Sequence, residues 1–291
     1  MKEFFKGHKF RADSITKIDN ANEIVDEYSN EGYELTLRQL YYQFVARGLI
    51  SNNQQEYKKL GSIINKARLA GLIDWDAIAD RTRHLRSHPH WSNPSAVLRS
   101  AAYSYAKNKW ANQEAYVEVW VEKDALIDIV QQVCDRWDVP CFSCRGYVSQ
   151  SSMYEAGKRH QEMNKKDREC HVIHLGDHDP SGMDMSRDIE DRLYMFEADV
   201  ELHRIALNMD QVDDLKPPPN PAKITDSRAG TYIAKHGYES WELDALEPKY
   251  LDTIIESKIL EFLDVELFEQ IKFEEDKDKD KIHTIANNWE E

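Results

Sequence analysis

Apolar residues recur at two different spacings along the chain, and the change of spacing divides it into a helical front part and a later α/β part. Residues 37–47 carry helical periodicity between an N-cap candidate, Thr36, and a C-terminal cap candidate, Gly48. A second helix is expected over residues 54–70, and Gly71 marks its end. The front part is therefore predicted to be built from short helices.

From residue 115 onward, short apolar runs alternate with amphipathic stretches. Strands are predicted over residues 116–121, 139–145, 171–177 and 200–207, with helices over 125–137, 151–161 and 181–196 between them. This alternation is typical of an α/β layer with a mostly parallel sheet, in which functional residues gather at the carboxyl ends of the strands. After a proline-rich connector, two helices are expected over 250–263 and 265–273, and the charged run 274–281 is predicted to be a solvated helix or a frayed tail.

The composition is that of a globular protein without a membrane span. Charged residues make up 31% of the 291 residues, and no apolar run reaches the roughly 18 residues that a span needs. The polar start lacks the apolar core of a secretory signal, so a cytoplasmic location is expected. Three segments are predicted: a helical domain over 1–112, an α/β core over 113–215, and a C-terminal extension with an acidic tail over 216–291.

The net charge of −15 is distributed unevenly. Residues 1–110 contain 17 Lys and Arg against 12 Asp and Glu, whereas residues 111–291 contain 21 against 41. A basic stripe on the second of two short helices is typical of helix-turn-helix and winged-helix modules, although many surface helices carry such stripes as solvated faces. The candidate contacts to a nucleic-acid backbone are Lys59, Lys66, Arg68, Arg81, Arg83 and, at the end of the second predicted strand, Arg145.

Carboxylates stand at the ends of two predicted strands. Glu122 follows the first strand directly, and Asp177 and Asp179 alternate at the end of the third strand, just before a helix. Oxygen ligands from neighbouring strand ends are what Mg²⁺ prefers, so the spacing predicts a Mg²⁺ site suited to phosphoryl transfer. The alternative is structural, because Asp179 before Pro180 is also a good helix N-cap and Asp177 could bind turn amides.

These two stretches resemble the motifs of a known family. Residues 119–125 read VWVEKDA and residues 176–182 read GDHDPSG. They are similar to the VEK(D/E) and DxDPxG motifs of the Toprim domain in topoisomerase VI A subunits and in the meiotic double-strand-break transesterases. The resemblance implies a Rossmann-like Toprim fold, dependence on Mg²⁺, and Glu122, Asp177 and Asp179 as metal ligands. The chain is similar to the small standalone A-subunit-like proteins of this family.

The family also has a winged-helix domain in front, with an Arg-x-x-(Tyr/Phe)-Tyr motif whose last tyrosine attacks DNA. This chain has RQLYY at residues 38–42. On a helix, Tyr41 lies in the apolar stripe, whereas Arg38 and Tyr42 lie one turn apart on another face. Tyr41 is therefore expected in the core and Tyr42 as the nucleophile, with Arg38 stabilising charge on the phosphate. The alternative is that Tyr42 only packs inside the helical domain.

The expected function is Mg²⁺-dependent DNA strand cleavage, in which Tyr42 forms a phosphotyrosyl link and Arg38 and Glu122 complete the catalytic group. In the family, the tyrosine of one subunit works with the metal site of another, which implies a homodimer. ATP-driven strand passage would require a separate ATPase subunit. Two alternatives stay open: a hydrolytic Toprim nuclease without a covalent intermediate, and a noncatalytic DNA-binding protein.

Overall fold

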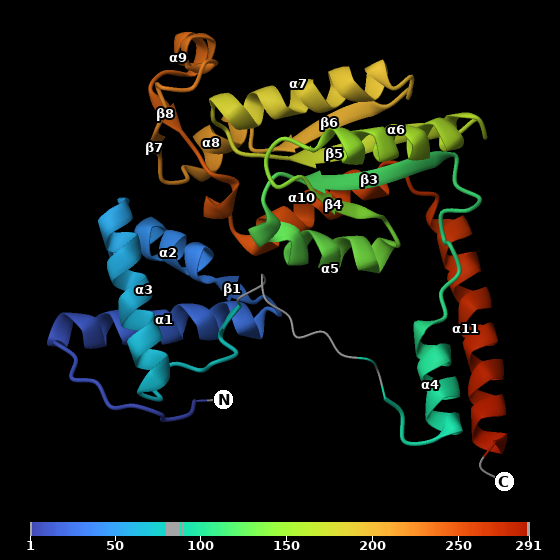
Figure 1. Ribbon diagram of the computed structural model, residues 1–291, viewed down its shortest axis with the longest axis horizontal. Coiled ribbons are helices and arrows are strands. Elements are labelled where there is room, and N and C mark those ends of the chain that lie inside the picture. Colours follow the sequence, from blue (N-terminus) through green and yellow to red (C-terminus); the bar gives the residue numbers. More distant parts are fainter. Residues whose placement is uncertain (1, 80–87, 89, 290–291) are drawn as a thin grey trace.

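The computed structural model describes residues 2–79, 88 and 90–289, and it has a helical front part and an α/β body (Figure 1). The front part contains α1 (Ala12–Asn30), α2 (Leu37–Ala46) and α3 (Gln54–Leu69), with a short parallel pair of strands, β1 (Leu35–Thr36) and β2 (Ile78–Ala79). Its core is one cluster of apolar side chains that includes Ile18, Ile24, Leu35, Leu40, Phe44, Leu60 and Ile64. The helices predicted for the front part are confirmed.

Local chemistry fixes where α2 and α3 begin and end. The Thr36 hydroxyl accepts a hydrogen bond from the Gln39 amide (3.2 Å), and the Gln39 side chain accepts one from the Thr36 amide (2.8 Å). This reciprocal pair is a capping box, which satisfies two amides at the start of a helix. Gly48 and Gly71 follow the two helices with φ of +67° and +69°, a region that glycine enters without a Cβ clash. The predicted caps are confirmed.

The body contains a four-stranded sheet in the order β4-β3-β5-β6, with every pair parallel. Its strands are β3 (Ala115–Val121), β4 (Cys141–Ser143), β5 (Glu169–Leu175) and β6 (Glu201–Ala206). The predicted α/β layer is confirmed, with strand ends shifted by a few residues. Val121 pairs with Leu175 at the ends of β3 and β5, so the residues that follow these two strands emerge side by side.

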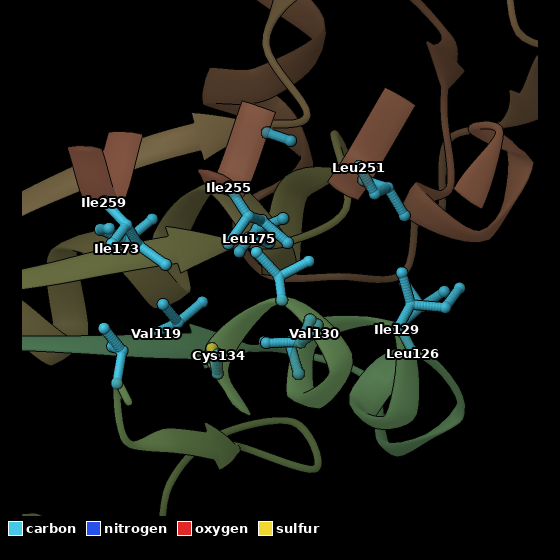
Figure 2. Close-up of a cluster of buried hydrophobic side chains, with 14 of the residues drawn as sticks. Val119, Leu126, Ile129, Val130, Cys134, Ile173, Leu175, Leu251, Ile255 and Ile259 are labelled. Carbon is cyan, nitrogen blue, oxygen red and sulfur yellow. The ribbon is translucent and has the colours of Figure 1, made fainter. Parts of the chain in front are cut away.

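Helices cover both faces of the sheet. On one face, α5 (Ile127–Trp137) and α10 (Pro248–Leu260) pack on β3 and β5 (Figure 2). On the other face, α6 (Gln150–Asn164) and α7 (Pro180–Met195) pack against side chains that include Trp120 and Val172. Because Ile255 and Ile259 of α10 belong to the same buried cluster as Val119 and Ile173, the C-terminal segment is part of the core of the sheet.

A pair of long helices extends from the body as an arm (Figure 1). It consists of α4 (Pro94–Ser104) and α11 (Val265–Asn288), which pack along each other. The sequence predicted a helix over 265–273 and left the run 274–281 open between a solvated helix and a frayed tail. Helix α11 continues through that run, so the helical alternative is confirmed. The buried Glu275 carboxylate supports it, since it lies 2.7 Å from Lys109 Nζ and 2.6 Å from Lys279 Nζ.

The remaining elements close one edge of the body and connect it to the front part. They are α8 (Met209–Leu215), α9 (Ala229–His236), the antiparallel pair β7 (Asn220–Pro221) and β8 (Glu239–Ser240), and the short 3-10 helices η1 (Asp124–Leu126) and η2 (Leu243–Ala245). Helix α2 packs against η2, so the helical front part contacts the body beside the carboxyl ends of β3 and β5. No helix of the described chain has the length and apolar character to cross a membrane.

Candidate functional site

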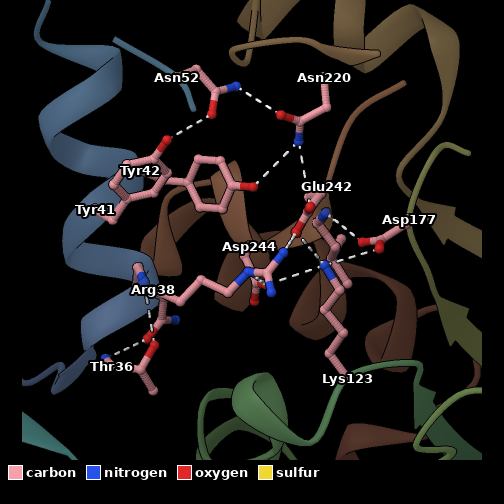
Figure 3. A network of polar contacts seen from close by, with 12 residues as sticks. Thr36, Arg38, Tyr41, Tyr42, Asn52, Lys123, Asp177, Asn220, Glu242 and Asp244 are labelled. Atoms are coloured by element: carbon pink, nitrogen blue, oxygen red, sulfur yellow. Dashed lines mark hydrogen bonds and ion pairs between the residues drawn. The ribbon is translucent and has the colours of Figure 1, made fainter. Parts of the chain in front are cut away.

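Three carboxylates converge on one ammonium group where the front part meets the body (Figure 3). Lys123 Nζ lies 2.9 Å from Asp177 Oδ2, 2.9 Å from Glu242 Oε2 and 3.1 Å from Asp244 Oδ2. Burial alone would lower the pKa of Lys123, but the charges of these carboxylates outweigh it and raise that pKa. We call these four residues the Lys123 cluster, and its lysine is held in the charged form.

The fold explains why residues so far apart in the sequence meet here. Lys123 follows β3, and Asp177 follows the neighbouring strand β5, whose end lies level with that of β3. Glu242 and Asp244 flank the buried Leu243 at the start of η2. The amide of Leu243 donates a 2.8 Å hydrogen bond to Asp177 Oδ1. The backbone of η2 therefore fixes both Asp177 and its two acidic neighbours.

Glu122 lies directly beside Asp177. Its Oε2 accepts a 2.8 Å hydrogen bond from the Asp177 amide. Burial, and then the negative charge of Asp177, raise the pKa of Glu122 to about 7, and the charge of Asp179 adds to the effect. Gly182 makes this proximity sterically possible, because a Cβ there would lie 2.3 Å from the Asp177 carbonyl oxygen and 3.0 Å from Glu122 Oε2.

Asp179, the third predicted metal ligand, has a different role in the structure. Its Oδ1 accepts a 2.6 Å hydrogen bond from the Gly182 amide, and Pro180 is the first residue of α7. This is the N-cap that the sequence offered as an alternative. Across the described residues, the ligand atoms of Glu122, Asp177 and Asp179 do not all lie within 4.8 Å of one another. The structure thus brings Glu122 and Asp177 together and commits Asp179 to the helix end.

Arg204 supports the turn that carries these acids. Arg204 lies on β6. Its guanidinium donates hydrogen bonds to the carbonyl oxygens of Gly176 (2.9 Å), Asp177 (2.7 Å) and Gly182 (3.0 Å). One side chain thereby fixes two carbonyl groups of the β5–α7 turn and one of the first turn of α7. The sequence analysis did not identify Arg204, because a single arginine within a short strand gives no pattern.

The Tyr42 hydroxyl belongs to the same polar network. Asn220 Nδ2 lies 3.4 Å from the Tyr42 hydroxyl and 3.4 Å from Glu242 Oε1, and Asn52 Nδ2 donates to Asn220 Oδ1 at 2.9 Å (Figure 3). Tyr41 is in the core, as expected. Tyr42 is equally buried, at 4% exposure, because Asn220 of β7 and the segment around η2 cover this face of α2.

Arg38 joins the tyrosine to the Lys123 cluster. Its guanidinium forms an ion pair with Glu242 and lies 3.1 Å from Asp244 Oδ2, and it stands 6.0 Å from the centre of the Tyr42 ring. Burial, and then the charge of Glu242, raise the pKa of Tyr42 to about 12. A pocket of about 270 Å³ opens beside these side chains and is lined also by Asn52, Asn220 and Tyr57. A polar ligand can therefore reach the tyrosine.

The predicted nucleic-acid contacts on α3 differ in whether they face solvent. Lys59 and Lys66 are exposed, and Lys59 Nζ lies 2.7 Å from Glu56 Oε1. Arg68 is used inside the domain, where it donates to the Trp75 carbonyl oxygen (2.7 Å) and lies over the Trp75 ring. On α3, Lys59 and Lys66 are thus the predicted contacts that face solvent.

The other predicted contacts lie beyond the front helices. Arg145 follows β4 with φ of +52°, its side chain is 74% exposed, and its Nε lies 3.0 Å from Asp124 Oδ1. Arg81 and Arg83 lie outside the described residues. Arg145 is therefore presented at the same carboxyl edge of the sheet as Glu122.

The site contains two acids that the sequence analysis did not assign. Glu242 and Asp244 belong to the segment WELDAL, residues 241–246. Their carboxylate-x-carboxylate spacing is the same as that of Asp177 and Asp179, and this repeated spacing is the signal that could have found them. No family model, curated protein or solved structure matches the chain, so the site is interpreted from its own geometry.

Proposed function

We propose that this chain cleaves DNA strands, with Tyr42 as the nucleophile and with the strand-end carboxylates as the charge-stabilising group. One observation carries the proposal: the Tyr42 hydroxyl and Asp177 belong to one network through Asn220, Glu242 and Lys123. The α/β body is then a Toprim domain and the front part a winged-helix-like domain, as in topoisomerase VI A subunits. The sequence motifs at residues 38–42, 119–125 and 176–182 support the same assignment.

The reaction is a transesterification. The Tyr42 oxygen forms a bond to phosphorus, and the bond from phosphorus to one deoxyribose oxygen breaks. The phenol proton passes to Glu242, which shares the Asn220 amide with Tyr42 and which the Lys123 ammonium keeps ionised against the effect of burial. The departing deoxyribose oxygen takes up a proton, and the product is a phosphotyrosyl link. The Arg38 guanidinium offsets negative charge on the phosphate beside the tyrosine ring.

The acids of the site fit a divalent cation. All of them offer oxygen ligands, which Mg²⁺ prefers, and the buried Asp244 Oδ1 has no hydrogen-bond partner among the described residues. Glu122 and Asp177 would hold the ion, and the unpartnered Oδ1 of Asp244 would be a further oxygen ligand. When bound, Mg²⁺ would orient the scissile phosphate and neutralise its charge.

The chain has a high net negative charge, so DNA needs positively charged side chains in order to approach this site. The exposed Lys59 and Lys66 on α3 and Arg145 after β4 are the phosphate contacts in this proposal. Tyrosine and carboxylates meet within one chain, so each subunit carries a whole site. A homodimer would place two such sites on a duplex and give paired cuts.

A hydrolytic nuclease is the second candidate, and it rests on the pKa of Glu122. A carboxylate whose pKa is raised to about 7 suits a general base that activates water near neutral pH. In that case Tyr42, buried at 4% exposure, closes the domain junction and forms no covalent link. Asp177 has the same metal-binding role in both candidates.

Plasmid cleavage separates the two. Supercoiled DNA is incubated with the full chain and Mg²⁺, stopped with detergent, and analysed with and without protease digestion. The variants are Tyr42→Phe, Asp177→Asn and a matched control, Tyr28→Phe. Tyr28 lies in α1 away from the site, is 5% exposed and also has its pKa raised to about 12 by burial.

The proposal predicts protein-linked cuts for wild type and Tyr28→Phe, and their loss in Tyr42→Phe and Asp177→Asn. Protein-free cuts that persist in Tyr42→Phe and vanish in Asp177→Asn would overturn the tyrosine route and establish the hydrolytic one. A wild-type chain that leaves the plasmid uncut would contradict both.

A further inference from the structure

A second polar group lies at the other end of the sheet from the Lys123 cluster. His171 Nδ1 lies 3.2 Å from His203 Nε2, and Glu201 Oε2 lies 3.6 Å from the first nitrogen and 3.7 Å from the second. Each of these side chains offers one potential metal-ligand atom, and the three atoms all lie within 4.8 Å of one another. We call them the His171 triad.

The register of the sheet builds the triad. His171 is the partner of Glu201, and Ile173 is the partner of His203, so Glu201 and His203 alternate along β6 on the face that also carries His171. The Phe262 ring stacks on the His171 ring, with centroids 4.1 Å apart and planes 15° apart. A parallel pair of strands and one aromatic ring therefore hold the imidazole in place.

The three distances describe a coordination site. Atoms separated by 3.2, 3.6 and 3.7 Å surround a point about 2.0 Å from each, which is the bond length of Zn²⁺ to imidazole nitrogen and carboxylate oxygen. His171 Nδ1 and His203 Nε2 are the ring atoms that face each other, at a distance of 3.2 Å.

The second nitrogen of His171 supports the same interpretation. His171 Nε2 is buried without a hydrogen-bond partner among the described residues, the side chain is 7% exposed, and Glu169 Oε2 lies 3.8 Å from that nitrogen. A carboxylate beside one imidazole nitrogen keeps the proton there and leaves the lone pair of the other nitrogen for a metal. The lone pair of Nδ1 then faces Glu201 and His203.

We propose that His171, His203 and Glu201 bind a divalent transition-metal ion of the Zn²⁺ class. Two imidazoles and one carboxylate favour such an ion over Mg²⁺, which prefers oxygen ligands alone. The Glu201 side chain is 68% exposed, so the ion is reached from solvent and a fourth position stays open for water. The site is independent of the cleavage proposed above, because it shares no residue with the Lys123 cluster.

Zn²⁺ titration of the full chain tests the site, with Mg²⁺ present in large excess and bound Zn²⁺ followed by a competing indicator. His203→Gln and Glu201→Gln remove one ligand each from partly or largely exposed positions. His283→Gln is the matched control, since His283 is an exposed histidine of α11. Co²⁺ absorption identifies the ligand type, because thiolate ligands add a charge-transfer band that nitrogen and oxygen ligands lack.

The expected result is one equivalent of tightly bound Zn²⁺ in wild type and in His283→Gln. Affinity falls by about 100-fold in His203→Gln and by about tenfold in Glu201→Gln, and the Co²⁺ form shows no thiolate band. Two results would overturn the site: no stoichiometric Zn²⁺ binding, which leaves the histidines as a hydrogen-bonded pair, or binding that neither ligand variant changes.

Discussion

The two ends of strand β5 carry polar groups of opposite character. Beyond its carboxyl end, the Asp177 carboxylate lies 2.9 Å from Lys123 Nζ, and Arg38 contacts the other acids of the same cluster. Near its amino end, His171 Nδ1 faces His203 Nε2 and Glu201 Oε2 within 3.6 Å. The first group is a set of carboxylates compensated by cations of the chain. The second is a set of metal-type ligand atoms turned toward one point.

The difference shows how a fold uses buried charge in two ways. Carboxylates taken out of water need a positive partner, and at the domain junction the chain supplies it, which also fixes Tyr42 beside the acids. Neutral imidazoles need no positive partner, so His171 and His203 can lie close together before an ion binds. We therefore expect the stability of the domain junction to depend on the cations of the chain. At the amino end of the sheet, we expect added metal to increase stability.

The largest effect is expected where the chain supplies the cation. Lys123→Met leaves three carboxylates without their ammonium and should lower the free energy of unfolding by about 3–5 kcal/mol. Lys249→Met is the control, because Lys249 is 67% exposed and lies 3.8 Å from Glu31; it should change stability by less than about 0.5 kcal/mol. Urea unfolding measures both, and equal losses would show that the cluster is not what holds the junction.

A smaller effect is expected at the turn that positions the acids. A Cβ at Gly182 would lie 2.3 Å from the Asp177 carbonyl oxygen, so Gly182→Ala should cost about 3 kcal/mol through a forced shift of the turn. Gly230→Ala on α9 is the matched control, since a Cβ there has nothing within 4 Å, and it should be neutral or slightly stabilising. Thermal unfolding of the two variants shows whether the close contact at Gly182 outweighs the higher helix propensity of alanine.

The arm offers a further buried carboxylate that cations of the chain compensate. Burial raises the pKa of Glu275, but hydrogen bonds from Lys109 and Lys279 outweigh it and lower the pKa from 4.5 to about 2. A carboxyl with a lower pKa in the folded state stabilises it above pH 4.5, and this contribution is lost as the pH falls toward the folded pKa.

Glu275→Gln should therefore cost about 2 kcal/mol at neutral pH and much less at about pH 3. Unfolding of wild type and variant at both pH values gives the comparison. A difference between the two proteins that does not change with pH would mean that the lysines do not hold this carboxylate.

The smallest effect is expected at the amino end of the sheet. Zn²⁺ at ten times its dissociation constant should raise the free energy of unfolding by about 1.4 kcal/mol, because it binds the folded chain alone. The gain should disappear in His203→Gln and persist in Lys123→Met, which alters only the other end. Loss of the gain in both variants would mean that the two ends of β5 are coupled.

Most of the fold could be predicted from the sequence, because it follows from local patterns. The capping box at Thr36, the glycines that end α2 and α3, and the apolar strands of the sheet are all signals within a few residues. For the charged run 274–281, local patterns left a solvated helix and a frayed tail open. The helix that forms there is held in part by Lys109, which lies more than 160 positions away along the chain and contacts Glu275 only in the folded structure.

The candidate site was predictable only for its strand-end residues. Glu122 and Asp177 meet because parallel strands end at one edge, which a sequence can indicate. Glu242 and Arg204 reach the site through tertiary contacts that no short motif encodes. Periodicity placed Tyr42 on a different face of α2 from the apolar stripe, but it does not show that this face is covered by residues about 180–200 positions later in the chain, among them Asn220.

Mass spectrometry of the DNA-linked protein tests the central claim most directly. After cleavage with Mg²⁺ and digestion of the DNA by nuclease, trypsin releases the peptide of residues 39–47, which contains both Tyr41 and Tyr42. Our account predicts a nucleotide adduct on this peptide, with fragment ions that place it on Tyr42. Cleaved DNA with an unmodified peptide, or an adduct on Tyr41, would contradict it.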